Sequence, residues 1–335
     1  MADNRIISLD YLKVIAIFAV VWIHGSDTNK IAKFLQTYCA FSVPCFIIIS
    51  AFLTQVSCST KTDCGYVALL FRRIKRLVPA YLAWTALYLI FRFIKRSLIS
   101  DMPIDFDWIA IIFCGGASYQ LWFVPALLIW TAVFAPLILF TTKRDNGNTL
   151  TASLLVLAGI LLWAGMKAWP SLYIPSGYEM FGYMKAQSGY FILGIGLWSL
   201  FRQGSVYSRN QLTLLSIGIG SLLFALLLLN LRTEYFNNFF TPLYSLSLFL
   251  SFFFILLKAR LPFLNVTSKY LAPCSFGIFL CHGIFIEGFQ VFLNVAGIDN
   301  TLFITTVGVI LTSFICSAVL CITLRNHKVT RWLVI

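Results

Sequence analysis

The sequence predicts an all-α protein: a polytopic transmembrane helical bundle of about ten spans with both termini in the cytoplasm. Three observations predict it, namely the composition, a series of long apolar runs and the distribution of basic residues between those runs. The chain has 335 residues, of which 60% are hydrophobic and only 11% are charged. A soluble domain carries roughly twice that charged fraction, so we expect lipid rather than water around most of the surface.

Ten apolar runs are long enough, or nearly so, to cross a bilayer, whose hydrocarbon core of roughly 30 Å requires about 20 helical residues. They lie at 6–25, 36–56, 78–97, 120–140, 149–166, 187–201, 211–230, 238–257, 271–293 and 302–324. The run at 187–201 contains three glycines and is expected either to pack tightly or to be broken. The stretch from about 100 to 120 is expected to be interfacial or re-entrant. We expect one integral-membrane domain over 1–335, with no appended soluble domain.

The basic residues set the expected orientation. Of the 25 Lys and Arg residues, Lys13 lies inside a span; with a cytoplasmic N-terminus, 16 of the others fall on the inner side and eight on the outer side. Cytoplasmic loops carry the excess of Lys and Arg, so both termini are expected inside, which requires an even number of spans. The net charge of +13 suits contact with anionic lipid headgroups. The sequence has no stripe of basic residues interleaved with aromatic ones, so we expect no nucleic-acid partner.

The nine cysteines give no metal-binding pattern, because most lie inside apolar runs and no CxxC occurs. Cys58 and Cys64 fall in a loop expected in the cytoplasm, where disulfides are rare, so we expect free thiols there. Two intramembrane histidines, His24 and His282, lack a third ligand at helical spacing. The sequence therefore predicts no metal site.

The first run contains three ionisable residues, Asp10, Lys13 and His24. Such residues are costly inside a span unless they face protein or water. Lys13 and His24 are separated by about 1100° of helical rotation, roughly 20° from a common face, and by a rise of about 16 Å. They predict a polar stripe, with Asp10, that lines a cavity through the membrane and acts in catalysis. The alternatives are that Lys13 snorkels or pairs with Asp10, and that His24 is interfacial rather than a general base.

A basic cluster at Arg72, Arg73, Lys75 and Arg76 precedes the third run. It is either an ordinary positive-inside anchor or a clamp whose guanidinium groups hold a phosphorylated donor at the cytoplasmic mouth. Pro79 is expected in the first turn of the following span.

The ninth run holds Ser275, His282 and Glu287. His282 is either a buried core residue or part of a site. Glu287 could partner His282, although a separation of five residues is not ideal for contact along a helix.

The order of these residues resembles the acyltransferase-3 family of integral-membrane sugar O-acyltransferases. The first matching feature is Leu9-Asp10-Tyr11-Leu12-Lys13 followed, after ten residues, by His24. The family usually has arginine where Lys13 stands, and lysine keeps the charge but loses the two-pronged hydrogen bonding. The second is Ser42-Val43-Pro44-Cys45-Phe46 leading to Ser50-Ala51-Phe52-Leu53, where the family usually reads Ser-Gly-Phe. The others are Arg73 and Arg76 with Leu77, Pro79 and Tyr81, and then Leu121-Trp122-Phe123-Val124-Pro125-Ala126-Leu127 with Ser275-Phe276-Gly277-Ile278 and His282.

The resemblance implies a multi-pass protein of the bacterial cytoplasmic (inner) membrane, which transfers an acyl group from a cytoplasmic donor such as acetyl-CoA to a hydroxyl of an extracytoplasmic or lipid-linked glycan. Acyl-CoA would be a co-substrate, and no bound cofactor is expected. Arg72, Arg73 and Arg76 would bind the donor. His24 would either activate the hydroxyl or carry the acyl group. The expected site-lining residues are Trp122, Ser275, His282 and Glu287.

Two other classes of protein remain as alternatives. A transporter or flippase of lipid-linked saccharides would also need polar intramembrane residues and broken helices. A non-catalytic membrane assembly factor would explain the hydrophobicity but not the charged stripe of the first helix. Consumption of acyl-CoA with release of free CoA thiol separates the enzyme from both.

Overall fold

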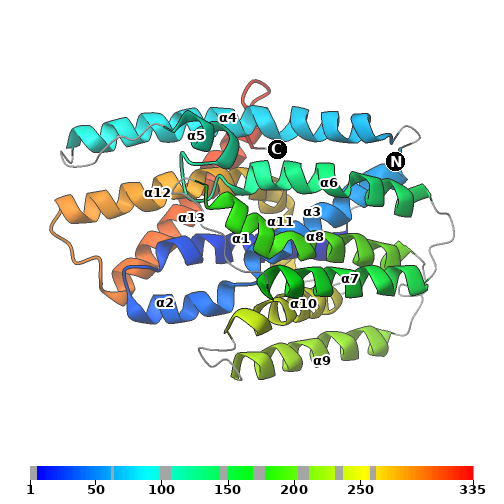
Figure 1. Cartoon of the computed structure of the whole chain (residues 1–335). Coiled ribbons are helices and arrows are strands. Elements are labelled where there is room, and N and C mark those ends of the chain that lie inside the picture. Colours follow the sequence, from blue (N-terminus) through cyan, green and yellow to red (C-terminus); the bar gives the residue numbers. More distant parts are fainter. Residues whose placement is uncertain are drawn as a thin grey trace.

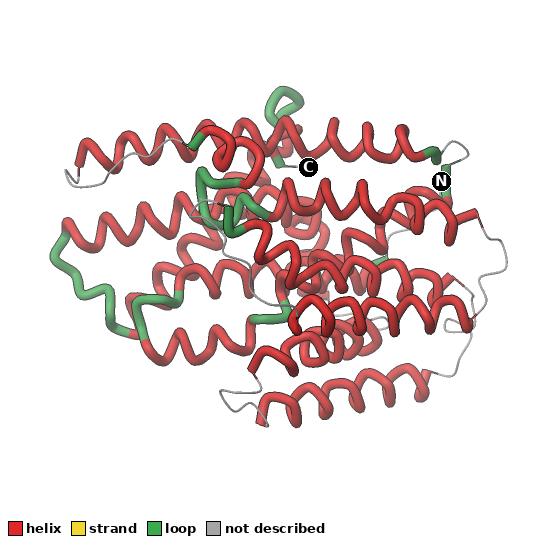
Figure 2. Tube along the Cα trace, viewed as in Figure 1, coloured by secondary structure: helices red, strands yellow, loops and turns green. Residues whose placement is uncertain are grey.

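The computed structural model describes residues 6–61, 64–98, 107–143, 149–168, 178–202, 211–230, 237–256 and 262–334. Within these ranges the chain forms helices joined by turns and loops, and it contains no β-strand (Figure 2). The long helices lie side by side and run mostly along one common direction (Figure 1). The prediction of an all-α helical bundle is confirmed.

The helices of at least 18 residues are α1 (Ile7–Gly25), α3 (Ser42–Ser59), α4 (Tyr66–Leu98), α6 (Phe123–Lys143), α7 (Thr149–Ala168), α8 (Met180–Arg202), α9 (Gln211–Asn230), α10 (Asn237–Leu256), α12 (Ser275–Val295) and α13 (Phe303–Asn326). The shorter elements are α2 (Lys30–Gln36), α5 (Trp108–Cys114), α11 (Pro262–Leu271) and the 3-10 turns η1 (Thr37–Cys39), η2 (Ala272–Cys274) and η3 (Arg331–Leu333). Each predicted apolar run falls mainly on one of the long helices.

Six stretches of the described residues are long and apolar enough to cross a membrane. They are Ile7–Gly25, Lys30–Ser59, Tyr66–Ser97, Phe123–Lys143, Asn265–Val295 and Phe303–Asn326. Shorter apolar helical stretches lie within α7, α9 and α10, at Leu150–Met166, Ile217–Leu226 and Leu243–Leu256. The chain is therefore a multi-pass membrane protein by helix length and composition, while the number of ten spans and the cytoplasmic termini stay predictions.

Helix α1 lies at the centre of the packing. It contacts α3, α10, α11, α12 and α13, and its side chains at Leu12, Ile17, Val20 and Val21 are fully buried. A helix surrounded by other helices presents its polar side chains to protein rather than to lipid, which removes most of the cost of placing ions in a span.

Helix α8 is continuous from Met180 to Arg202, so the glycine-rich run packs tightly and is not broken. A Cβ atom added at Gly189 would collide with the carbonyl oxygen of Gly159 on α7, and one at Gly194 would collide with the backbone of Ile48 on α3. Small residues allow helices in lipid to approach this closely. Gly189 and Gly194 therefore fix α8 against α7 and α3.

Helix α4 corrects one expectation. It runs unbroken from Tyr66 to Leu98 with Pro79 inside it, so Pro79 does not begin the span as predicted. The apolar residues from Tyr66 to Phe71 extend the helix toward the N-terminus. The arginine cluster, which precedes the third apolar run in the sequence, consequently lies within the same helix as that run.

The loop between α3 and α4 corrects a second expectation, because Cys58 and Cys64 form a disulfide. The prediction of free thiols rested on the assumed cytoplasmic side and ignored geometry. The Cα atom of Cys58, in the last turn of α3, lies 5.4 Å from that of Cys64, a separation that suits a disulfide.

The ambiguous stretch from about 100 to 120 contains the short helix α5, and residues 100–106 lie outside the described residues. The Asp107 side chain caps α5 by accepting hydrogen bonds from the backbone of Ile109 and Ala110, both at 3.0 Å. Gly115 ends the helix at φ 78°, and a Cβ there would collide with the backbone of Leu121 and Trp122. A helix of this length is about 10 Å long, too short to cross a bilayer.

Candidate functional site

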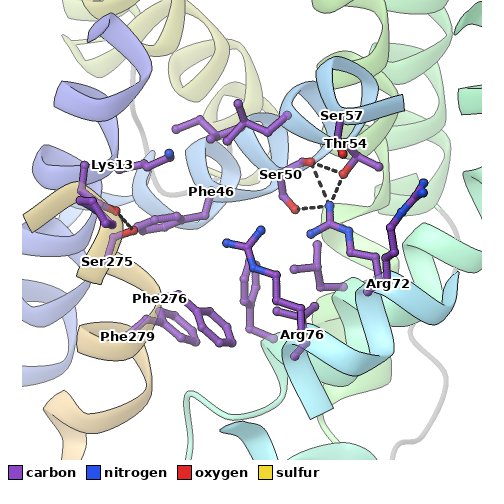
Figure 3. Close-up of a pocket in the computed structure, with 18 of the residues that line it drawn as sticks. Lys13, Phe46, Ser50, Thr54, Ser57, Arg72, Arg76, Ser275, Phe276 and Phe279 are labelled. Carbon is purple, nitrogen blue, oxygen red and sulfur yellow. Dashed lines mark hydrogen bonds between the residues drawn. The ribbon is translucent and has the colours of Figure 1, made fainter. Parts of the chain in front are cut away.

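A cationic cavity of about 330 Å³ lies between α1, α3, α4, α6 and α12 (Figure 3). Five of the residues that line it carry a positive charge: Lys13, Lys61, Arg72, Arg73 and Arg76. None of its lining residues is Asp or Glu. A partly apolar hollow with this excess of positive charge is suited to an anionic ligand that has an apolar part.

The arginines of α4 reach the cavity together because their spacing places them on neighbouring turns. Arg73 donates hydrogen bonds through Nη2 to the carbonyl oxygen and the hydroxyl of Ser50, both at 3.0 Å, and to the hydroxyl of Thr54 (Figure 3). These contacts fix the Arg73 guanidinium against α3. Arg76 extends into the cavity from α4 and makes no hydrogen bond or ion pair with any other described residue.

Arg72 donates to the sulfur of Cys64 at 3.2 Å, which ties the cavity to the disulfide-linked loop. Lys13 reaches the cavity from α1, and its ammonium lies 3.1 Å from the carboxylate of the buried Asp10. The pairing of Lys13 with Asp10, given above as the alternative to a role in catalysis, is observed, and it leaves Lys13 on the cavity surface. Asp10 partly offsets the positive charge that Lys13 brings into the membrane.

A second cluster lies beyond the cavity and contains both intramembrane histidines, which we call the histidine pair. The rings of His24 and His282 are 5.4 Å apart, and the ring of Tyr119 lies 4.4 Å from that of His24. His282 is fully buried, and its Nδ1 lies 3.1 Å from the carbonyl oxygen of Ile278. Its Nε2 is buried without a hydrogen-bond partner among the described residues. An unpaired buried nitrogen is costly and marks the pair as a candidate site.

The loop from Gly115 to Trp122 is held against α12 by hydrogen bonds that the sequence did not reveal. Gln120 donates through Nε2 to the hydroxyl of Tyr88 and, at 3.3 Å, to the carbonyl oxygen of Leu280. Tyr88 donates to the same carbonyl oxygen at 2.8 Å, and Ser118 donates to Oε1 of Gln120 at 2.7 Å. This network places Tyr119 beside His24.

Gly283 is what lets the loop come so close. A Cβ atom at Gly283 would lie 2.9 Å from the Tyr88 hydroxyl, 3.0 Å from Nε2 of Gln120 and 3.1 Å from the Tyr119 hydroxyl.

The pKa of Tyr119 is raised well above its ordinary value. The main cause is burial of the Tyr119 hydroxyl, and the nearby carboxylates of Glu287 and Asp27 add to it. Tyr119 therefore stays protonated and can donate a hydrogen bond.

The polar stripe predicted on α1 is divided between the cationic cavity and the histidine pair. Lys13 lines the cationic cavity, whereas His24 is not among the residues that line it. The described cavity therefore carries Lys13 alone of the two, and a cavity that carries both residues stays a prediction. Phe279 lines the cavity, and its ring lies 6.0 Å from the ring of His282.

The remaining candidate residues have different surroundings. Ser275 lines the cavity and donates to the carbonyl oxygen of Ala272 at 2.9 Å. Trp122 stacks on Tyr183, with ring centroids 5.0 Å apart, and does not line the cavity. Glu287 forms an ion pair with Lys95 at 2.9 Å, so it does not partner His282 as was considered. Residues 282 and 287 lie about 140° apart around a helix, which explains the difference.

No group of three or more His, Cys, Asp or Glu residues in the described part of the chain is arranged to hold a metal ion. The absence of a metal from the reaction stays a prediction, because the residues outside that part are not tested.

Comparison with known proteins gives one family. The acyltransferase-3 family model, described as an acyltransferase domain, matches residues 6–322. The match includes every residue of the cationic cavity and of the histidine pair. No curated protein and no solved structure matches the chain.

Proposed function

We propose, from the premise that the chain belongs to the acyltransferase-3 family, that this membrane acyltransferase is of the O-acetyltransferase type. It moves an acyl group, acetyl in the simplest case, from acyl-CoA on the cytoplasmic side to a hydroxyl of an extracytoplasmic or lipid-linked glycan. The bacterial cytoplasmic membrane is the expected location, since acyl-CoA is made on one side of it and surface glycans are displayed on the other.

The observation that carries the proposal is the cationic cavity without an acidic lining residue. The phosphate groups of CoA need several positive charges, and guanidinium groups hold phosphate through paired hydrogen bonds. Arg73 is already fixed by Ser50 and Thr54, so little ordering is required when a phosphate arrives. Arg76 has its donors available, and Lys13 adds a charge from the opposite helix.

The histidine pair is where we place the chemistry. In the direct route, His24 accepts the proton of the acceptor hydroxyl while its oxygen forms a bond to the acyl carbonyl carbon. The carbon–sulfur bond of the thioester then breaks, and CoA leaves as a thiolate that takes up a proton. In the alternative route, a ring nitrogen of His24 first displaces CoA and carries the acyl group, which the hydroxyl then removes. Tyr119 lies against His24 and can donate a hydrogen bond to the reacting groups.

A transporter or flippase of lipid-linked saccharides is the alternative function. It would explain intramembrane polar residues and arginines that hold the phosphate of a lipid carrier, but it gives no reason for a buried histidine pair beside a tyrosine hydroxyl. It also predicts no consumption of acyl-CoA.

Acyl-CoA supplied to oriented vesicles tests function and orientation together, because acyl-CoA does not cross membranes. Vesicles should contain the protein and the surface glycans of its own cells, and release of free CoA thiol should be measured. We expect release in inside-out vesicles and none in right-side-out vesicles, relative to vesicles without the protein. Release in neither would contradict the enzyme, and release only in right-side-out vesicles would reverse the orientation. Mass spectrometry of the glycans then identifies the added group.

A further inference from the structure

Three phenylalanines, which we call the phenylalanine wall, line the cationic cavity, and one of them also neighbours the histidine pair. They are Phe46 of α3, Phe123 of α6 and Phe279 of α12, and all three line the cavity. The ring of Phe279 lies 5.1 Å from that of Phe123 and 6.4 Å from that of Phe46. Figure 3 shows Phe46 and Phe279 facing the same hollow as Lys13 and Arg76.

Phe279 is the member of the wall that also touches the histidine pair. Its ring lies 6.0 Å from the ring of His282, which is fully buried and does not line the cavity. His24 follows at 5.4 Å from His282. Phe279 and His282 are three residues apart on α12, so the helix holds both toward the same side. The Phe279 ring therefore lines the cationic cavity and is also a neighbour of the His282 imidazole.

We propose that Phe279 forms the acyl-binding site and limits the length of the acyl group; this inference rests on the proposed function. With the phosphates of the donor on the arginines, the thioester end of the molecule points toward the wall. The acyl carbonyl carbon must come within about 3–3.5 Å of the attacking atom for transfer. An acyl chain that approaches the histidine pair from the cavity must therefore lie against the Phe279 ring.

The phenylalanine wall also determines which acyl groups the site accepts. Its rings offer apolar contact and no hydrogen bond, which suits a short alkyl group. A longer chain needs the space that the buried Phe279 ring fills. Hydrophobic pockets distinguish substrates by roughly 10- to 200-fold per methylene, so one phenyl group is sufficient to restrict the donor to short acyl chains.

The test compares acetyl-CoA with butyryl-CoA and hexanoyl-CoA in inside-out vesicles that contain the full-length protein. Release of CoA thiol is measured for the wild type, Phe279→Ala and the milder Phe279→Leu, at equal protein levels in the membrane. We expect the butyryl-to-acetyl rate ratio to rise at least tenfold in Phe279→Ala and by a smaller factor in Phe279→Leu. Phe276→Ala is the matched control, because Phe276 lines the same cavity on the same helix and should leave the ratio unchanged.

The outcomes separate this inference from the function on which it rests. If the wild type consumes none of the three donors, the proposed function fails, and this inference fails with it. If the wild type consumes acetyl-CoA but both Phe279 variants keep the wild-type ratio, the inference alone is overturned. An equal change of the ratio in Phe276→Ala would also overturn it, since the effect would then belong to the cavity as a whole.

Discussion

The cationic cavity and the histidine pair are linked through Phe279, which lines the first and neighbours the second, yet the protein builds them in different ways. Three cations of the cavity come from five consecutive residues of α4, and the others come from α1 and the end of α3. The histidine pair depends on α4, α12 and the loop before α6, which are held together by hydrogen bonds of Tyr88 and Gln120, and on α1, which packs against α12. The cavity is therefore a local property of the sequence, whereas the histidine pair is a tertiary one.

This difference predicts how the two regions fail. The positive charge of the cavity is shared among several residues. Loss of the hydrogen bonds of one or two of them should therefore weaken binding of the acyl donor by a modest factor. The chemistry proposed for the histidine pair depends on one imidazole, and its geometry depends on a few contacts, so we expect a single change there to have a larger effect.

The largest effect is expected from His24→Ala. A general base contributes typically 10²- to 10⁴-fold to the rate, so glycan acylation should fall at least 100-fold while the protein still accumulates in the membrane. His24→Gln keeps some hydrogen bonding but cannot take up the proton, and it should be nearly as inactive. His327→Ala, in the segment after α13, is the control and should work normally. A well-expressed His24→Ala protein that still acylates would leave His282 as the next candidate.

The next effect is expected from Gly283→Ala, which tests whether the contacts around the histidine pair matter. The new methyl group would press on Tyr88, Tyr119 and Gln120 at about 3 Å. Forced overpacking costs typically 1–3 kcal/mol, so we expect acylation to fall about 10- to 100-fold. Donor affinity, measured with labelled acyl-CoA, should stay within about threefold, because the cavity is untouched.

Gly288→Ala is the matched control for this experiment. It lies on the same helix, and a Cβ atom there meets nothing within 4 Å. If both alanine variants lose activity equally, α12 tolerates no change for reasons unrelated to the histidine pair, and the comparison between the two regions loses its support.

A smaller effect is expected in the cavity from the double variant Arg73→Lys, Arg76→Lys. Lysine keeps the charge but loses the paired donors, so donor use should weaken by about 1.4 kcal/mol, roughly tenfold. The measurement is the acyl-CoA concentration that gives half-maximal thiol release. Arg96→Lys, an exposed position on the same helix, should change nothing. Normal acyl-CoA consumption by the double variant would leave the arginines as topology anchors only.

The cavity could be predicted in part from the sequence because its signals are local. The closely spaced arginines of α4 and the buried charges of α1 are visible without any knowledge of packing. The boundary at Pro79 was predicted wrongly, because a proline inside a continuous helix and one at a helix start give the same sequence signal. The disulfide between Cys58 and Cys64 was missed because the assumed side of the membrane outweighed a short separation along the chain.

The histidine pair could be predicted only as two separate histidines. Their contact depends on how α1 and α12 cross, which no helical pattern specifies. Tyr119 and Gln120 gave a weak signal, since they are polar residues directly before the Leu121-Trp122-Phe123 motif. Phe279 gave none, because one phenylalanine among 32 becomes distinctive only when its neighbours are known.

The smallest effect is expected from Glu287→Gln. This variant tests the partner of Glu287, which is Lys95 in the structure, whereas the sequence suggested His282. Glu287 is paired with Lys95, and the side chains are 27% and 23% exposed. Partly exposed ion pairs contribute little, about 0–1 kcal/mol, so acylation should change less than about threefold, and Lys95→Met should behave alike. If Glu287 instead oriented His282 through a rearranged α12, Glu287→Gln would lower the acylation rate toward that of His24→Ala. Lys95→Met would then leave the rate nearly unchanged. Unequal effects of the two variants would therefore join Glu287 to the histidine pair, and equal small effects would leave it a structural contact at the edge of the site.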